Sequence, residues 1–302
     1  FGPGEYGRRL TMQERNRWYE IHVPPQYRKG TPMPVVMVLH GGGGYPAIVR
    51  YKSGMSDVAD REGFIVLYPA ATGNLFSDRL LYWNFGAKPT HAKQQGIDDI
   101  AFLNAVLDDV AKYFTVDSKR VYCTGISNGG QMTMRVGAEM YDRIAAIAPV
   151  ASLLPPGEFF PAPKGPLPMI VFHGKQDAWI PYTGGPSPES SPFEPFTLKP
   201  IEQNVASWLR QNGVTGKASV SAAGASKSTA YQGAPRGEVI LWALEDGGHT
   251  WPGGKTTSAE LAGKIGFIKI KSTGKVSQDV SASQMMWNFF KRHSLGERTT
   301  KP

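Results

Sequence analysis

Apolar runs of strand length alternate with helical patterns along most of the chain. Strands are predicted at 17–23, where apolar and polar residues alternate, and at the apolar runs 35–39, 64–69, 121–125, 144–151, 168–174 and 238–245. Helices are predicted near 56–63 and at 97–114, 129–140, 201–213 and 281–293, the last opened by a serine cap. This alternation predicts an α/β fold with a mostly parallel sheet covered by helices on both faces.

Proline- and glycine-rich stretches interrupt this pattern at 155–168, 181–200 and 252–277. The first two could be domain linkers, but regular elements continue the same alternation on both sides of each. We therefore expect surface loops on a single catalytic domain that spans residues 1–302.

The net charge of +8, from 33 basic and 25 acidic side chains, raises the possibility of nucleic-acid binding. The basic residues are scattered, however, and lysines between 264 and 275 alternate with apolar residues as in a protected edge strand or hairpin. No apolar run approaches the roughly 18 residues of a membrane span. We expect no nucleic-acid or membrane partner, and a monomer or weak oligomer.

The single cysteine, Cys123, excludes an intrachain disulfide and a pair of thiolates for structural zinc, so no metal is expected. Its place on a predicted strand indicates a buried packing residue. The first residues lack both an initiator Met and an apolar signal region, which favours a mature secreted protein or a shortened chain.

A G-x-S-x-G pattern, Gly125 to Gly129, lies between a predicted strand and a predicted helix. The pattern alone is weak and can be an ordinary glycine-rich helix start. Between a strand and a helix, its glycines allow a sharp turn that lifts the Ser127 hydroxyl above the sheet. Ser127 is the candidate nucleophile.

A serine nucleophile needs a histidine base that is oriented by an acid, and in this architecture the chain order is Ser, acid, His. Of the histidines after Ser127, His249 lies in a glycine-rich loop beyond the strand 238–245, whereas His293 ends a helix. Asp177 follows the strand 168–174 and is the candidate acid, ahead of Asp142. A solvated loop histidine and a surface turn aspartate are the alternatives.

The oxyanion of an ester reaction needs backbone donors that are already in place. The Asn128 amide, directly after the serine, is one candidate, and Gly42 in the loop 40–44 is the other. The glycines of this loop could instead cradle a phosphate, but they lack the register of a nucleotide-binding loop.

These motifs resemble the α/β-hydrolase esterases that include feruloyl and acetylxylan esterases and polyhydroxybutyrate depolymerases. The resemblance rests on LHGGGG (39–44), DDIAFL (98–103), GISNGGQMT (125–133), HGKQDAWIPY (173–182), GGHTWPGG (247–254) and SASQMMWNFFKRH (281–293). It implies the α/β-hydrolase fold, an acyl-enzyme mechanism with Ser127, Asp177 and His249 as the triad, secretion and no cofactor. Polyester depolymerases often have a disulfide, which this sequence lacks.

Aromatic residues near the motifs are candidates for substrate binding, since such side chains form flat apolar pockets, although each could equally be a core residue. They are Tyr45, Trp83, Trp179, Tyr182 and Trp251. The sequence predicts a secreted serine carboxylesterase for a polymer-derived ester, foremost a feruloyl or related plant-wall ester. A polyester depolymerase, a prolyl-peptidase-like hydrolase and a non-catalytic binding protein with this fold are the alternatives.

Overall fold

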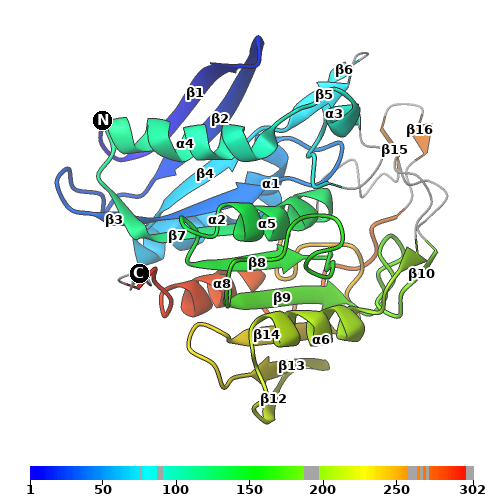
Figure 1. The fold of residues 1–302 in the computed structure, drawn as a ribbon. Coiled ribbons are helices and arrows are strands. Elements are labelled where there is room, and N and C mark those ends of the chain that lie inside the picture. Colours follow the sequence, from blue (N-terminus) through cyan, green and yellow to red (C-terminus); the bar gives the residue numbers. More distant parts are fainter. Residues whose placement is uncertain are drawn as a thin grey trace.

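The computed structural model describes residues 1–74, 77–86, 91–186, 197–256, 264–265, 268–269 and 272–296, and its centre is one twisted sheet (Figure 1). Within these residues the sheet has ten strands in the order β1-β2-β4-β3-β7-β8-β9-β14-β13-β12. The strands are β1 (Gly4–Met12), β2 (Arg15–Val23), β3 (Met33–Leu39), β4 (Ile65–Pro69), β7 (Val116–Ile126), β8 (Ala146–Val150), β9 (Met169–Gly174), β12 (Ala218–Ala223), β13 (Ser226–Tyr231) and β14 (Val239–Leu244). The neighbouring pairs from β4 to β14 are parallel, and the pairs at both ends are antiparallel. The predicted, mostly parallel sheet is confirmed.

Two hydrophobic clusters show that helices cover both faces of the sheet, as predicted. One cluster joins the sheet to α4 (Asp99–Tyr113), α5 (Asn128–Glu139) and α6 (Ile201–Gln211). The other joins it to α1 (Pro46–Ser53), α2 (Met55–Glu62) and α8 (Ala282–Phe290). In Figure 1 the first three helices lie in front of the sheet and the last three behind it.

Successive residues of a central strand belong to opposite clusters, because side chains of a strand alternate between its two faces. Val35 and Met37 of β3 are in the cluster with α4, whereas Val36 and Val38 are in the cluster with α8. Cys123 of β7 is fully buried in the first cluster, and burial raises the pKa of its thiol to about 12. Its predicted packing role is confirmed.

Several elements have little sequence signal and were not predicted. Strand β12 is mostly exposed on both faces, and the one packed face of β1 is only half-buried and includes Arg8 beside Tyr6, Leu10 and Met12, so both strands lack a fully buried apolar stripe. The turn between β1 and β2 uses Gln13 and Glu14 at positive φ, 48° and 58°, instead of the Asn-Gly pair typical of such turns. Helix α1 lies where the sequence pattern predicts no helix. It begins with a proline directly after the loop 40–44.

The smaller elements decorate the sheet. They are β5 (Thr72–Asn74), β6 (Ser77–Tyr82), α3 (His91–Gln94), β10 (Gly185–Pro186), β11 (Thr197–Leu198), β15 (Lys264–Ile265) and β16 (Ile268–Lys269). Strand β15 pairs antiparallel with β16 in the lysine-rich segment where an edge strand or a hairpin was expected, whereas much of 181–200 and 252–277 lies outside the described residues. No helix in the described part of the chain is long and apolar enough to cross a membrane.

Candidate active site

Ser127 lies in a strained turn between β7 and α5, with φ 56° and ψ −123°. A Cβ on Gly129 would lie 2.4 Å from the carbonyl oxygens of His40 and Leu39, and a Cβ on Gly125 would lie 2.5 Å from the Gly129 carbonyl oxygen. Only glycine fits at these two positions, because the end of β3 approaches the turn so closely. Ser127 itself remains half-buried although its neighbours on both sides are buried. The turn therefore has the geometry predicted from the G-x-S-x-G pattern.

Asp177 and His249 are brought together over 72 residues of sequence. The Nδ1 atom of His249 lies 2.8 Å from Oδ2 of Asp177, and both residues are buried. A carboxylate can only accept here, so His249 carries its proton on Nδ1, and Nε2 is left as a proton acceptor. This is the orientation that a general base needs.

The loops that carry these two residues are bonded to each other. Parallel strands β9 and β14 end side by side, and the amides of Lys175 and Gln176 donate to the carbonyls of Leu244 and Gly247 at 2.8 and 2.9 Å. Because β7 is parallel to them through β8, Ser127 also lies at this carboxyl edge of the sheet.

The environment of Asp177 favours its charged form. Burial alone would raise the pKa of this carboxyl, but the His249 ring, the nearby His173 and the Ile180 amide together hold the pKa below its ordinary value. The amides of Trp179 and Ile180 both donate to Oδ1 at 2.8 Å. His173 lies 3.5 Å from Oδ2, and its pKa is lowered by burial. Asp177 is thus a fixed carboxylate that can orient and stabilise a histidine.

The loop 40–44 lies beside the start of α5. A Cβ on Gly42 would be 3.5 Å from Cβ of Asn128, and a Cβ on Gly41 would be 3.5 Å from Cβ of Ser127. The Gly43 and Gly44 amides donate to the carbonyls of Leu81 and Gly41, whereas we find no acceptor for the Gly42 amide among the described residues. Asn128 is the first residue of α5, where an amide has no acceptor within its own helix. Both predicted oxyanion donors are therefore close together and available.

Trp83 links the start of α5 to the loop 40–44 through hydrogen bonds. Its amide and carbonyl bond the Asn128 side chain at 2.7 and 3.2 Å, and its indole Nε1 donates to the His40 carbonyl at 3.0 Å. A Cβ on Gly42 would also lie 2.6 Å from a ring carbon of Tyr82. These contacts of Trp83 and Tyr82 have no signal in the sequence, because the two residues lie about 40 positions from the loop and the serine.

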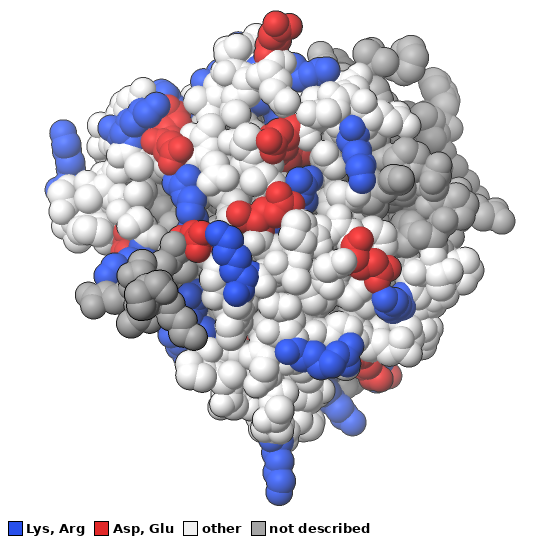
Figure 2. Space-filling model, in the orientation of Figure 1, with Lys and Arg blue, Asp and Glu red and all other residues white. Residues whose placement is uncertain are grey.

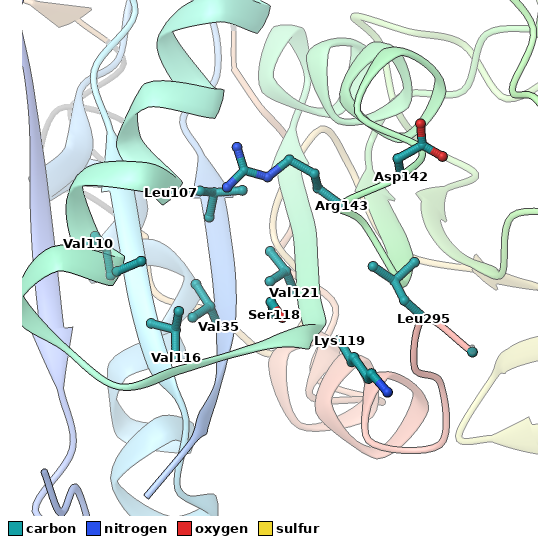
Figure 3. Close-up of a pocket in the computed structure, with 12 residues that line it drawn as sticks. Val35, Leu107, Val110, Val116, Ser118, Lys119, Val121, Asp142, Arg143 and Leu295 are labelled. Atoms are coloured by element: carbon teal, nitrogen blue, oxygen red, sulfur yellow. The ribbon is translucent and has the colours of Figure 1, made fainter. Parts of the chain in front are cut away.

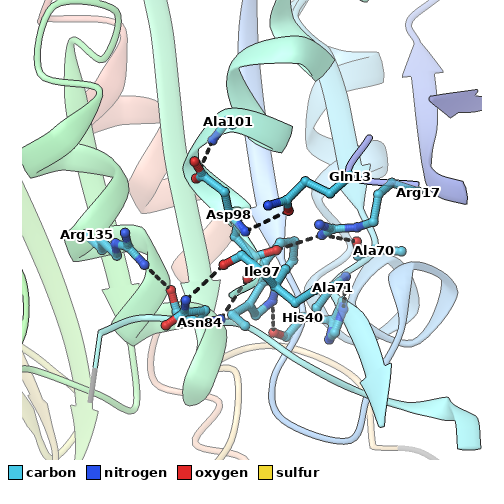
Figure 4. Close-up of polar contacts among 12 residues, drawn as sticks. Gln13, Arg17, His40, Ala70, Ala71, Asn84, Ile97, Asp98, Ala101 and Arg135 are labelled. Carbon is cyan, nitrogen blue, oxygen red and sulfur yellow. Dashed lines mark hydrogen bonds and ion pairs between the residues drawn. The ribbon is translucent and has the colours of Figure 1, made fainter. Parts of the chain in front are cut away.

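His40 completes this support as a buried neutral side chain (Figure 4). Its Nδ1 donates to the Gly41 carbonyl at 2.8 Å, and its Nε2 accepts from the Ala71 amide at 3.1 Å. Burial lowers the pKa of His40 to about 4, so the ring carries no charge near neutral pH. Beside it, Arg17 pairs with the buried Asp99 at 2.7 Å, and Asp99 accepts from the Asn84 amide.

The five aromatic candidates occupy different environments. Trp179 is half-buried and stacks on the His249 ring, with centroids 5.9 Å apart, and Tyr45 is 41% exposed. Tyr182 is half-buried and donates to Glu202 at 3.4 Å. Trp83 and Trp251 are buried at 0% and 1% exposure, and the Trp251 indole donates to Ser283. Trp83 and Trp251 are therefore core residues, which is the alternative that the sequence left open for each aromatic candidate.

A pocket of about 500 Å³ lies at the opposite edge of the sheet (Figure 3). Its lining includes Val35, Leu107, Val110 and Val121, near the start of the parallel strands. No predicted site residue is part of this lining, so it is separate from the candidate active site.

The architecture is the α/β-hydrolase fold, with a serine turn, a glycine loop and an Asp–His pair at one edge of the sheet. In agreement, the family described as "Esterase PHB depolymerase" matches residues 18–160. "Putative esterase NocK" of Nocardia uniformis subsp. tsuyamanensis is 29% identical over 82% of this chain and 74% of its own length. "Feruloyl esterase B" of Piromyces equi is 32% identical over 63% of this chain but only 33% of its own length.

Among solved structures, an acetyl xylan esterase from Aspergillus awamori has the same fold, with a TM-score of 0.53 and 17% identity over 81% of this chain and 94% of that chain. These comparisons confirm the resemblance found in the sequence to the esterases that include polyhydroxybutyrate depolymerases and feruloyl and acetylxylan esterases. The expected class of enzyme, a carboxylic ester hydrolase with a serine-hydrolase fold, is confirmed with it.

Proposed function

We propose that the protein is a secreted, single-domain serine esterase in which Ser127, His249 and Asp177 form the catalytic triad. The observation that carries this proposal is the 2.8 Å contact of His249 with a buried carboxylate, at the sheet edge that also holds the strained Ser127 turn. No metal or cofactor is needed for this chemistry.

In the acylation step, the Ser127 oxygen attacks the ester carbonyl carbon while His249 Nε2 takes the hydroxyl proton. The amides of Asn128 and Gly42 hold the oxyanion that forms. The tetrahedral intermediate then expels the alcohol, which receives the proton from His249, and Ser127 remains acylated. Water then attacks the acyl carbonyl carbon in the same way, which releases the acid and restores the Ser127 hydroxyl.

The foremost substrate is a feruloyl or related plant-wall ester. Support comes from the relative named a feruloyl esterase and from the half-buried Trp179, whose ring lies against His249 and could contact an aromatic acyl group. Tyr45 and Tyr182 are proposed as further contacts. A polyester depolymerase is the second candidate, because the matching family carries that activity in its description.

A Ser127→Ala variant tests the mechanism. Hydrolysis of a 4-nitrophenyl ester should fall by about 10⁶ in kcat, since loss of the nucleophile removes the acyl-enzyme pathway. Retention of activity within about tenfold of wild type would contradict the triad. A fluorophosphonate should label wild type at Ser127, and a folded protein that stays unlabelled would favour the non-catalytic binding protein.

The substrate is decided by a panel of methyl ferulate, acetylated xylan, polyhydroxybutyrate film and a terephthalate ester. We expect the highest kcat/KM for methyl ferulate. A clear preference for the polyester film or the terephthalate ester would instead support the depolymerase.

A further inference from the structure

A second cavity, a groove of about 1040 Å³, lies between the β1–β2 hairpin and the β5–β6 hairpin. Strand β2 pairs antiparallel with β4, Tyr19 opposite Pro69, so the residues before Trp18 continue past the carboxyl end of β4. The tip of the hairpin therefore reaches the edge of the sheet that holds the candidate active site. Figure 1 shows this tip on the same side of the molecule as β5 and β6.

The groove is connected to the predicted oxyanion loop through Leu81. This residue lines the groove, and its carbonyl accepts from the Gly43 amide at 2.9 Å. A polymer in the groove would thus pass directly beside the loop that holds Gly42. The position suits a subsite for the part of a substrate beyond its ester bond.

The groove presents free cations and an exposed indole. Arg9 and Arg15 line it and are exposed, and neither side chain makes an ion pair or hydrogen bond with the residues that the structure describes. Trp18 is 36% exposed and lies directly across from Arg9 in the hairpin, so the two side chains are on one face. By contrast, the groove carboxylate of Glu20 already lies 3.5 Å from Arg50.

Four lining residues have buried polar atoms without a hydrogen-bond partner in the part of the chain that the structure describes, among them Nε of Arg17 and Oε2 of Glu20. The other two atoms are Oγ1 of Thr72 and Oε1 of Gln95. Such atoms are unfavourable unless water or a ligand meets them. They add hydrogen-bonding capacity that a hydroxyl-rich ligand can use.

We propose that this groove binds a carboxylate-bearing polysaccharide, a uronate chain, that carries or adjoins the ester. A guanidinium group binds carboxylates through two parallel hydrogen bonds, and an indole face packs against the apolar face of a sugar ring. Arg9 and Trp18 supply both chemistries on one face of the hairpin, whereas Arg15, opposite Met12, lines the groove from the other face, next to the hairpin tip. The choice of a plant-wall polymer rests on the proposed function, whereas the affinity of the groove for a carboxylate-bearing chain rests on its own charged and aromatic groups.

The experiment measures binding of de-esterified polygalacturonate by isothermal titration at low salt, for wild type and for a variant with Arg9→Gln and Arg15→Gln. We expect the variant to lose about tenfold or more in affinity, and wild-type affinity to fall as salt is raised. A Trp18→Ala variant should also bind more weakly, with a loss that persists at high salt. Hydrolysis of 4-nitrophenyl acetate should be unchanged in all variants, which separates this subsite from the proposed catalytic function.

The matched control replaces Lys217 and Lys227 by Gln, which removes two exposed charges at the opposite end of the sheet. Its affinity should stay within about twofold of wild type. Equal losses in the control and in the arginine variant would overturn the subsite, because net charge alone would then explain binding. Binding of single-stranded DNA as tight as that of polygalacturonate would overturn the assignment to a uronate chain.

Discussion

At the scale of single residues, three hydrogen bonds hold the Asp177 carboxylate in the candidate site. One carboxylate oxygen bonds His249, and the other accepts the amides of Trp179 and Ile180. The two amides hold the carboxylate in position, and the first oxygen determines the tautomer of His249. A substitution can therefore remove the charge of this side chain while the two amides still hold it in position.

An Asp177→Asn variant should keep the fold and lose activity. Its amide oxygen can still accept from Trp179 and Ile180, but its NH₂ group would favour the wrong tautomer of His249. We expect kcat for a 4-nitrophenyl ester to fall by about 10⁴-fold with little change in Tm. The control is Asp142→Asn on the surface, where Asp142 pairs with Lys164, and it should match wild type. A drop of less than tenfold at Asp177 would assign the role of the acid elsewhere.

At the scale of elements, the turn from β7 into α5 depends on how closely β3 approaches it. The Gly129 position faces backbone oxygens of residues 39 and 40, which cannot move without shifting the end of the central strand. The strain at Ser127, with its positive φ, is thus held by the sheet around it. The same approach brings the loop 40–44 beside the serine.

Gly129→Ala should therefore destabilise the protein strongly. We expect a loss of about 3 kcal/mol or more in the free energy of unfolding by urea, because a methyl group would overlap two carbonyl oxygens. Gly7→Ala in β1 is the matched control, since a Cβ there meets nothing within 4 Å. It should change stability by no more than about 0.5 kcal/mol. Similar stabilities for the two variants would mean that the turn can relax away from β3.

At the scale of the whole molecule, two electrostatic properties matter: the distribution of charged side chains on the surface, and the dependence of folding stability on pH through the buried His40. On the face drawn in Figure 2, basic and acidic side chains are mixed and form no field of one sign. His40 is neutral and fully buried, with a pKa of about 4 against about 6.5 for an unfolded histidine. Between these values the unfolded chain binds a proton that the folded chain does not, so acid favours unfolding.

His40→Gln tests this linkage. Glutamine can still donate to the Gly41 carbonyl or accept from the Ala71 amide, but it does not titrate. Between pH 7 and pH 4 the wild type should lose up to about 3 kcal/mol more of unfolding free energy than the variant, measured by urea unfolding at each pH. Parallel stability curves for the two proteins would show that His40 accepts a proton within the folded state.

The sequence by itself determined the central strands, their parallel arrangement and the candidate residues at their carboxyl ends. This was possible because buried parallel strands form continuous apolar runs, and because the order of Ser127, Asp177 and His249 is constrained by the fold. The edge strands β1 and β12 and the neighbouring β13 could not be predicted: β1 and β12 have no fully buried apolar residue, and the buried positions of β13 are the serines Ser226 and Ser228.

Only the tertiary structure decided which aromatic residues are available and what supports the site. Trp83 and Trp179 look alike in sequence, yet one is enclosed between Asn128 and His40 while the other stacks on His249. The groove likewise depends on a hairpin whose tip extends past β4. Periodicity reports which side of an element is buried, whereas contacts between distant segments arise only when the sheet brings those segments together.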